Sequence, residues 1–280
     1  MGEDKATRAT SAARSYYDAS DVDGFYAHAW GGEDIHVGVY TDPREAIPVA
    51  TGRTVERLAG KLGDALGAGS TVLDMGSGYG GAARRLAGQY GCHVVALNIS
   101  ELQNHRHRAL NAERGLDDRI DVVTGSFHDI PAPDGSFDVV WSQEALCHSG
   151  DRSRALREAT RVLRPGGHLV FTDTMAAEDA PEGELSPLAE RLRLTDLATP
   201  GFYVEQLRAL DLAGADYEDL SAHMLTHYER LSEEVRSPAP ELVDAVSPGY
   251  LERLRTNLPQ VARACRDGRL RWGIFHGRHR

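Results

Sequence analysis

The 280-residue sequence is poor in cysteine, and its cysteines show no functional spacing. Cys92, Cys147 and Cys265 are odd in number, lie far apart and lack the short intervals of metal ligands. We therefore expect neither a disulfide framework nor a structural zinc, and we predict that no metal is bound. This cysteine usage also agrees with a reducing, cytoplasmic compartment.

Basic side chains and long apolar runs are also scarce. The sequence has 31 Lys and Arg against 42 Asp and Glu, which gives a net charge of -11. Because a surface that binds a phosphate backbone needs clustered Lys and Arg, we expect no nucleic-acid partner. No apolar run approaches the roughly 20 residues that span a bilayer, and the N-terminus lacks the apolar core of a signal peptide. These absences predict a cytoplasmic protein without membrane contact.

The remaining composition is that of one large α/β domain with additions. Hydrophobic residues make up 41% and charged residues 26%, values that are ordinary for a globular chain. Strands alternate with helical patterns, which predicts a mostly parallel sheet with helices on both faces. The predicted strands lie at residues 71–73, 92–97, 120–124, 136–141, 168–172, 215–221 and 270–276.

A glycine-rich loop follows the first predicted strand. The sequence STVLDMGSGYGGAARRL, residues 70–86, reads as a strand, a tight loop with Gly76 and Gly78, and a helix. Such a loop is typical of a nicotinamide or flavin site, or of a site for S-adenosylmethionine. Asp74, at the tip of the strand, would repel a pyrophosphate and attract the amino group and ribose hydroxyls of S-adenosylmethionine. We therefore predict that Asp74, Gly76 and Gly78 bind this methyl donor.

Polar residues at the ends of the next strands extend the predicted cofactor site. Asn98 ends the second strand, about twenty residues past the glycines, where a Rossmann-type fold places the group that holds the ribose hydroxyls. Ser126 and Phe127 follow the third strand and would border the adenine. Gln143 follows the fourth strand and is also predicted to contact the cofactor.

The flanks of the sheet region predict a cap. Residues 16–40 are dense in aromatic, histidine and glycine residues, which fits either a helix pinned to the core or a lid over a ligand. We predict an N-terminal helical segment and lid at residues 1–66 and a cofactor-binding core at 67–175. Residues 176–280 would complete the sheet and add a helical insertion that caps its carboxyl edge, where open α/β sheets bind ligands.

Four motifs carry a family resemblance. LDMGSGYGG, GSFHDIP, DVVWSQEA and LRPGGHLVFTD resemble the motif series of class I S-adenosylmethionine-dependent methyltransferases, over about residues 70–175. The flanking stretches YYDASDVDGFYAHAWGGEDIHVGVY, ALNIS, TPGFY, HMLTHY and WGIFH resemble the sarcosine/dimethylglycine N-methyltransferases that finish glycine betaine synthesis. The resemblance thus spans nearly the whole chain.

This resemblance implies a fold, a cofactor and a reaction. The fold would be the Rossmann-like class I methyltransferase fold, with a seven-stranded, mostly parallel sheet, and the cofactor would be S-adenosylmethionine. The enzyme would convert dimethylglycine, together with sarcosine, to the osmolyte glycine betaine, so its partner would be a small-molecule amine. Related phosphoethanolamine N-methyltransferases use a tyrosine and histidine pair, and their patterns match Tyr26 and His148, which we predict to be catalytic.

The predicted acceptor site combines aromatic and basic side chains. Rings stabilise a methylated ammonium through their quadrupoles, so Trp30 and Tyr203 are candidates, together with His36 in the lid. A guanidinium grips a carboxylate with two hydrogen bonds, which makes Arg191 and Arg193 candidates for the acid end of the substrate.

Two other functions stay open at this point. Cap sequences change their chemistry more readily than the sheet does, so the acceptor could be another small amine or a natural product. A non-catalytic protein that senses S-adenosylmethionine is the third possibility, although it would not need Tyr26 and His148. The sequence leaves open whether the chain is a monomer or a homodimer.

Overall fold

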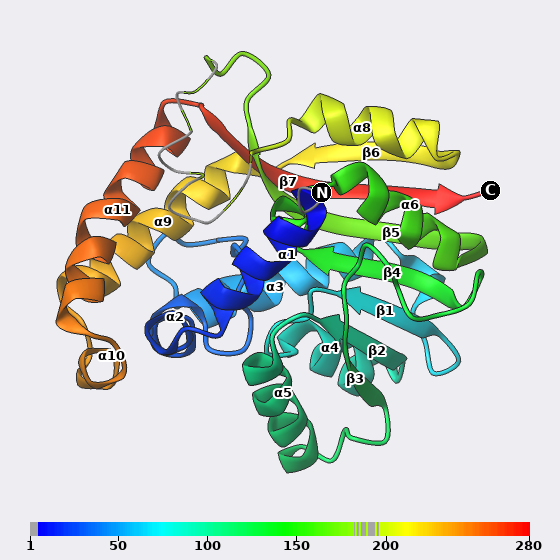
Figure 1. Cartoon of the computed structure of the whole chain (residues 1–280), viewed down its shortest axis with the longest axis horizontal. Coiled ribbons are helices and arrows are strands. Elements are labelled where there is room, and N and C mark those ends of the chain that lie inside the picture. Colours follow the sequence, from blue (N-terminus) through cyan, green and yellow to red (C-terminus); the bar gives the residue numbers. More distant parts are fainter. Residues whose placement is uncertain (1–4, 182, 184, 186–188, 190–193, 195) are drawn as a thin grey trace.

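A single seven-stranded sheet forms the centre of the computed structural model, which describes residues 5–181, 183, 185, 189, 194 and 196–280 (Figure 1). The strands lie in the order β3-β2-β1-β4-β5-β7-β6. Their bounds are β1 Thr71–Met75, β2 His93–Asn98, β3 Ile120–Thr124, β4 Phe137–Gln143, β5 Leu163–Ala176, β6 Leu212–Asp219 and β7 Leu270–His279.

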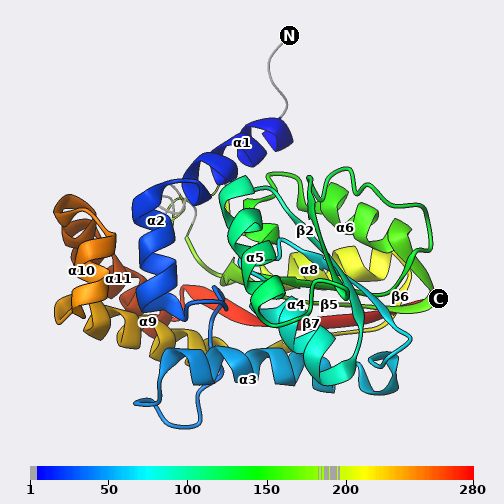
Figure 2. The ribbon, with the colours of Figure 1, turned by 90° about the horizontal axis from the view of Figure 1, so that it is seen from below.

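Helices lie on both faces of this sheet and beside it (Figures 1 and 2). The longer ones are α1 Lys5–Tyr17, α3 Ile47–Gly60, α5 Glu101–Glu113, α6 Arg152–Val162, α8 Pro200–Ala209, α9 Ser221–Arg236 and α11 Pro248–Arg266. The shorter ones are α2 Ser20–Phe25, η1 Tyr26–Trp30, η2 Gly63–Ala65, α4 Gly81–Arg85, η3 Leu86–Tyr90, η4 Leu146–His148 and α10 Pro240–Ala245. No helix within the described ranges has the length and apolar character needed to cross a bilayer.

Two apolar cores result from the alternation of side chains along the central strands. Val72 and Val139 belong to the core on one face, whereas the next residues, Leu73 and Val140, belong to the core on the other. Successive residues of a strand point to opposite faces, so strands buried on both sides read as continuous apolar runs. This pattern explains why the short runs of the sequence predict buried strands.

Parallel pairing brings the carboxyl ends of β1, β2 and β4 to one edge of the sheet. β7 runs antiparallel between β5 and β6 and closes the sheet. The predicted class I methyltransferase fold is confirmed. Several strand bounds differ from the prediction by a few residues, and the largest difference is that β5 begins at Leu163, whereas the sequence predicts a strand only from residue 168. Leu163 pairs with Phe137 before a register irregularity, and Gly166, with φ +80°, absorbs the distortion inside the strand.

The insertion before β7 forms a helical layer beside the sheet. α9 and α11 pack against each other, and α9 also contacts β7 and η1 (Figures 1 and 2). Ser247 caps α11: its hydroxyl accepts a hydrogen bond from the Tyr250 amide, and Pro248 begins the helix, where no helical donor is lost. The N-terminal helices and these insertion helices together border the carboxyl edge of the sheet.

Candidate active site

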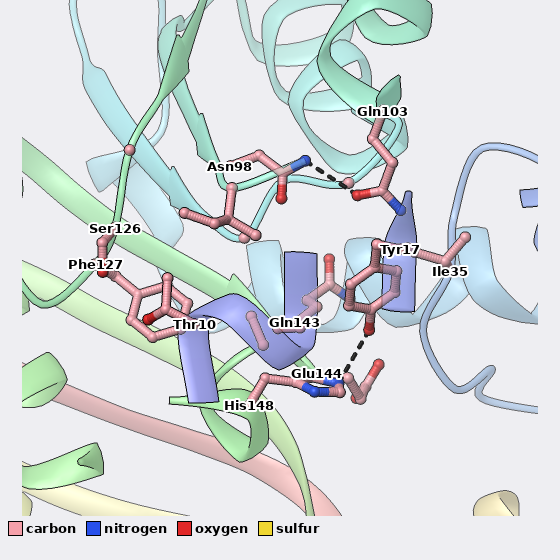
Figure 3. A pocket seen from close by; sticks show the side chains of 16 residues that line it. Thr10, Tyr17, Ile35, Asn98, Gln103, Ser126, Phe127, Gln143, Glu144 and His148 are labelled. Atoms are coloured by element: carbon pink, nitrogen blue, oxygen red, sulfur yellow. Dashed lines mark hydrogen bonds between the residues drawn. The ribbon is translucent and has the colours of Figure 1, made fainter. Parts of the chain in front are cut away.

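One pocket at the carboxyl edge collects most of the predicted cofactor residues (Figure 3). It is lined by Gly76, Gly78, Asn98, Ser126, Phe127 and Gln143. α1 contributes Thr10, Ala13 and Tyr17 to its wall, and the segment between η1 and α3 contributes Ile35. Asp74 lies in an adjoining hollow that shares Gly76, Ile35 and Gln143 with this pocket. The fold therefore brings residues from four strand ends and the N-terminus around one space.

The glycine loop is constrained on two sides. Gly76 has φ +80°, and a Cβ there would lie 2.3 Å from Cβ of Ala145. Gly78 has φ +53°, and its Cβ would lie 3.0 Å from Cδ1 of Ile35. Left-handed backbone and close neighbours both require glycine, so the loop can turn sharply while its backbone faces the pocket.

Asp74 is a buried acid with one carboxylate oxygen that pairs with no described residue. Its side chain is 3% exposed, and Oδ2 has no hydrogen-bond partner among the described residues. Burial raises the pKa of Asp74 to about 7, and the nearby His36 opposes that shift. A buried carboxylate with an unsatisfied oxygen fits a cationic ligand group, such as the ammonium of S-adenosylmethionine.

His36 lies beside this acid. Its Nε2 is 3.7 Å from Oδ1 of Asp34, and its Nδ1 donates to the carbonyl of Val37. Burial lowers the pKa of His36, but the Asp34 carboxylate outweighs burial, so the net shift is upward. The predicted acceptor residue His36 therefore lies next to Asp74, in the hollow at the donor end of the pocket, and its raised pKa favours the protonated form.

Asn98 and Gln103 form a pair suited to hydroxyl groups. The Asn98 amide donates to Oε1 of Gln103 at 3.0 Å and to Oδ1 of Asn104 at 3.2 Å. This arrangement leaves Nε2 of Gln103, which has no partner in the described chain, as a donor beside the Asn98 carbonyl. A donor next to an acceptor matches a vicinal diol. Sequence reasoning missed Gln103, although it follows the helix cap Ser100 by three residues.

The opposite wall presents another donor and an apolar side. Trp141 donates to Oε1 of Gln143 at 2.9 Å, which leaves the buried Nε2 of Gln143 without a partner in the described ranges. That amide fits a carboxylate oxygen. The Ser126 hydroxyl accepts from the His128 amide, and Phe127 supplies an apolar surface beside it. The Gln143 amide therefore fits the methionine end of the cofactor, and Ser126 with Phe127 fits the adenine.

The side chain next to His148 is Tyr17, whereas the sequence pairs His148 with Tyr26. Nε2 of His148 lies 3.0 Å from the hydroxyl of Tyr17, and the Tyr26 hydroxyl instead contacts that of Tyr16 at 3.4 Å. Tyr17 ends α1, the chain turns at Asp18 before α2 begins, and no hydrogen bond joins Tyr26 to His148 among the described residues. The ring centroids of Tyr17 and Tyr26 are 6.0 Å apart.

Glu144 is a second residue that the sequence analysis missed. It lines the cofactor pocket with φ +46°, a conformation that residues other than glycine rarely adopt. Its carboxylate accepts hydrogen bonds from the Val37 amide at 3.0 Å and from the indole of Trp272. Burial raises the pKa of Glu144, and these donors oppose the shift. The acid before Ala145 in the motif DVVWSQEA was the available signal.

The predicted acceptor residues lie in separate places. Trp30 is buried against Tyr26 and Tyr228, away from the cofactor pocket. Tyr203 lies neither in the cofactor pocket nor in the cluster around Trp30. It is fully buried in α8, where its hydroxyl donates to the Asp173 carboxylate at 2.5 Å and its ring packs against Phe171. Arg191 and Arg193 lie outside the described residues.

Comparisons with known proteins agree with this geometry. A family model described as a methyltransferase domain matches residues 73–171. The chain is 48% identical to the sarcosine/dimethylglycine N-methyltransferase of Halorhodospira halochloris, over 97% of both chains. It is 46% identical over 98% of its length to the glycine/sarcosine/dimethylglycine N-methyltransferase of Actinopolyspora halophila, but it spans only 48% of that relative.

A solved structure shows the same likeness. A candidate sarcosine dimethylglycine methyltransferase from Galdieria sulphuraria matches with a TM-score of 0.85 at 35% identity, over 91% of this chain and 97% of that one. The fold, the glycine loop and the matched domain define a class I S-adenosylmethionine-dependent methyltransferase, and S-adenosylmethionine is its cofactor. Within that class, the chain belongs to the sarcosine/dimethylglycine N-methyltransferase family.

The first prediction concerns the glycine loop. We expect Gly76→Ala to abolish S-adenosylmethionine binding in isothermal titration, because the new methyl would meet Ala145 at 2.3 Å on a left-handed backbone. The strain should also lower the stability by about 1 kcal/mol or more. Gly88→Ala is the matched control, since a Cβ there has no neighbour within 4 Å. Equal cofactor affinity in both variants would contradict this account of the loop.

The second prediction concerns the pH dependence that Asp74 imposes. Because burial raises its pKa from 3.8 to about 7, ionised Asp74 destabilises the cofactor-free fold. The penalty is absent below about pH 4, grows up to about pH 7 and is constant above it. Asp74→Asn should therefore raise the melting temperature at about pH 8 by a few degrees, and much less at about pH 4.5.

The same variant should lose the stabilisation that added S-adenosylmethionine gives to the wild type. Differential scanning fluorimetry at both pH values, with and without cofactor, measures both effects. A melting difference that does not change with pH would show that Asp74 is not the titrating group.

Proposed function

We propose that this enzyme transfers the methyl group of S-adenosylmethionine to the nitrogen of sarcosine and of dimethylglycine, with glycine betaine as the final product. The observation that carries the proposal is the Tyr17 and His148 pair at the wall of the cofactor pocket, in a chain whose relatives are named for these acceptors. Betaine is an osmolyte, so we further propose a cytoplasmic role in osmoprotection.

His148 has the properties of a base for an amine acceptor. The cofactor, when bound, supplies a methyl group on a sulfonium. Sarcosine and dimethylglycine are ammonium ions at neutral pH, so each must lose a proton before its lone pair can attack. Burial lowers the pKa of His148 to about 4, and the charge of Arg152 adds to this effect. The imidazole is therefore neutral at pH 7, with a free ring nitrogen that can accept the proton transiently, although a pKa of about 4 makes it a weak base.

Tyr17 and Glu144 complete the acceptor side of the pocket. Burial raises the pKa of Tyr17 well above its usual value, so its hydroxyl stays protonated and orients the imidazole of His148 through their hydrogen bond. The Glu144 carboxylate lines the same pocket and favours a nitrogen that carries positive charge. Alignment and charge compensation are what an in-line methyl transfer requires of the protein.

The arginine proposal for the substrate carboxylate is retained. Ala189 and Leu194, on either side of Arg191 and Arg193 in the sequence, form a small apolar cluster with Cys147, the residue before His148. The described residues that flank the two arginines in the sequence therefore contact the chain next to the proposed base. Tyr203 is not retained, because its hydroxyl and ring are both used in the core.

Two alternatives remain distinguishable by experiment. A methyltransferase of another amine or of a natural product would leave sarcosine and dimethylglycine unreacted. A sensor of the cofactor would bind S-adenosylmethionine and form no S-adenosylhomocysteine with any acceptor. The buried neutral histidine favours the amine methyltransferase over the sensor, since binding alone needs no base.

The third prediction is the acceptor ranking. Dimethylglycine and sarcosine should react at least about tenfold faster than glycine, because the ring of Tyr17 in the pocket wall can stabilise a methylated ammonium group and a primary ammonium loses more hydration on entry. Phosphoethanolamine should react negligibly, since it lacks the carboxylate. Mass spectrometry of the methylated products, with the four amines side by side, measures the ranking. If glycine reacted as fast as dimethylglycine, an aromatic ring would not be what selects the methylated acceptors.

The fourth prediction separates Tyr17 from a structural role. Tyr17→Phe keeps the ring and removes the hydroxyl that holds His148, so kcat for dimethylglycine should fall about tenfold or more. Cofactor affinity, measured by calorimetry, should change less than about twofold, because no hydroxyl contact to the donor is proposed for Tyr17. Tyr90→Phe, a change of the same type at the end of η3, should leave both quantities unchanged. Unaltered kcat in Tyr17→Phe would refute the pairing as a catalytic device.

A further inference from the structure

The proposed reaction leaves a proton inside the protein, and the need for a proton exit rests on that proposed function. Each acceptor gives up one ammonium proton per methyl transfer. His148 lies against Tyr17 and Cys147 below α1, and Nδ1 is buried without a partner among the described residues. With a pKa lowered to about 4, the imidazole cannot retain the proton between turnovers. The proton therefore needs a route to solvent.

A line of tyrosine hydroxyls begins at this histidine. The Tyr17 hydroxyl lies 3.0 Å from Nε2 of His148, and the Tyr17 ring lies next to that of Tyr26, with the ring centroids 6.0 Å apart. The hydroxyl of Tyr26 lies 3.4 Å from that of Tyr16. Three hydroxyls, from α1 and η1, thus lead away from the histidine.

The far end of this line opens into a different cavity. We call it the second cavity; its volume is about 730 Å³, and it lies between the N-terminal helices and α11. Tyr16, Tyr26 and Tyr250 line it, whereas Tyr17 and His148 line the cofactor pocket. The exposed residues Arg8, Ser11, Ser15 and Arg253 also line the second cavity, so it reaches the surface.

We propose that Tyr17, Tyr26 and Tyr16 form a proton relay that carries the acceptor's proton from His148 to water in the second cavity. The cofactor pocket would then stay closed to water while the methyl group moves. A dry site protects the sulfonium from hydrolysis and strengthens the charge interactions around it. The relay supplies an exit for the proton that is separate from the entrance of the ligands.

The relay balances if His148 carries its resting proton on Nε2. Nδ1 takes the ammonium proton as the nitrogen lone pair is freed, and Nε2 gives its proton to the Tyr17 oxygen. The Tyr17 hydrogen passes to Tyr26, that of Tyr26 to Tyr16, and that of Tyr16 to a water or a buffer base in the cavity. Each oxygen gains one hydrogen and loses one, so rotation of the hydroxyls restores the starting state.

Tyrosine suits this path because it can donate and accept at once. Burial raises the pKa of Tyr16, Tyr17 and Tyr26, so none of them ionises near neutral pH. The hydroxyls therefore transmit a proton without storing a charge. Tyr16 and Tyr26 touch no reacting atom; they are positioning residues that act through Tyr17.

Rapid-quench kinetics with dimethylglycine test the relay. In Tyr26→Phe, His148 starts each experiment unprotonated, so the first turnover should keep its wild-type rate. Later turnovers should slow about fivefold or more, which gives a burst of one product per active site. A small buffer base such as imidazole should restore part of the steady rate, and the solvent deuterium isotope effect on kcat should rise. Tyr16→Phe should behave in the same way.

Tyr228→Phe is the matched control. Tyr228 lines the same cavity and packs against Trp30, but within the described part of the chain no hydrogen bond joins its hydroxyl to the three relay tyrosines. It should show neither a burst nor buffer rescue. If Tyr26→Phe and Tyr16→Phe have the kinetics and isotope effect of Tyr228→Phe, the relay is wrong.

A measurement without turnover separates this inference from the proposed function. Nitrogen-15 NMR of histidine-labelled enzyme should show His148 with hydrogen on Nε2 and a bare Nδ1. The opposite tautomer would overturn the relay even if the enzyme makes betaine. Failure of the wild type to methylate any amine would refute the proposed function instead, and with it the need for a proton exit.

Discussion

The carboxylate of Glu144 is the contact on which the shape of the site depends. It accepts hydrogen bonds from the Val37 amide before α3 and from Trp272 on β7, so it joins the N-terminal segment, the end of β4 and the last strand. If either donor were lost, the buried carboxylate would keep its desolvation cost without full compensation. The contacts between the three segments therefore stabilise one another. The left-handed backbone at Glu144 aims the side chain at both donors. Ile35, two residues before Val37, is thereby held against Gly78.

Buried acids give this edge of the sheet its affinity for cations. Asp34, Asp74 and Glu144 lie around His36; burial raises the pKa of Asp74 and of Glu144, whereas His36 and Arg85 hold the pKa of Asp34 below its usual value. For Asp74, a pKa of about 7 in place of 3.8 corresponds to about 4 kcal/mol of unfavourable free energy when the carboxylate is charged. A sulfonium donor with an ammonium group, and an acceptor that becomes a quaternary ammonium, both offset such a cost. The same acids would disfavour a pyrophosphate, which agrees with the choice of cofactor.

Local patterns predicted the strands, the glycine loop and the strand-end residues, because each depends on neighbours in the sequence. Contacts between side chains on different helices depend on the turns between those helices, so local sequence patterns could not predict them. The pattern that singled out Tyr26 places an aromatic residue correctly on a helix, yet the turn at Asp18 decides that Tyr17 faces His148. Tyr203 shows the converse: an aromatic residue after a helix cap looks available, but Asp173 and Phe171 enclose it from the sheet.

Different faces of the polar helix α1 line the cofactor pocket and the second cavity. Consecutive helical residues point about 100° apart, so adjacent tyrosines cannot face the same space. Thr10, Ala13 and Tyr17, spaced by three and four residues, form the stripe that closes the cofactor pocket. Ala12, Ser15 and Tyr16 form a second stripe that faces the other cavity. A helix that presents different residues to two cavities shows no simple apolar stripe in its sequence. Only where the stripes converge, at Tyr16 and Tyr17, can hydroxyl groups bring the two spaces into contact.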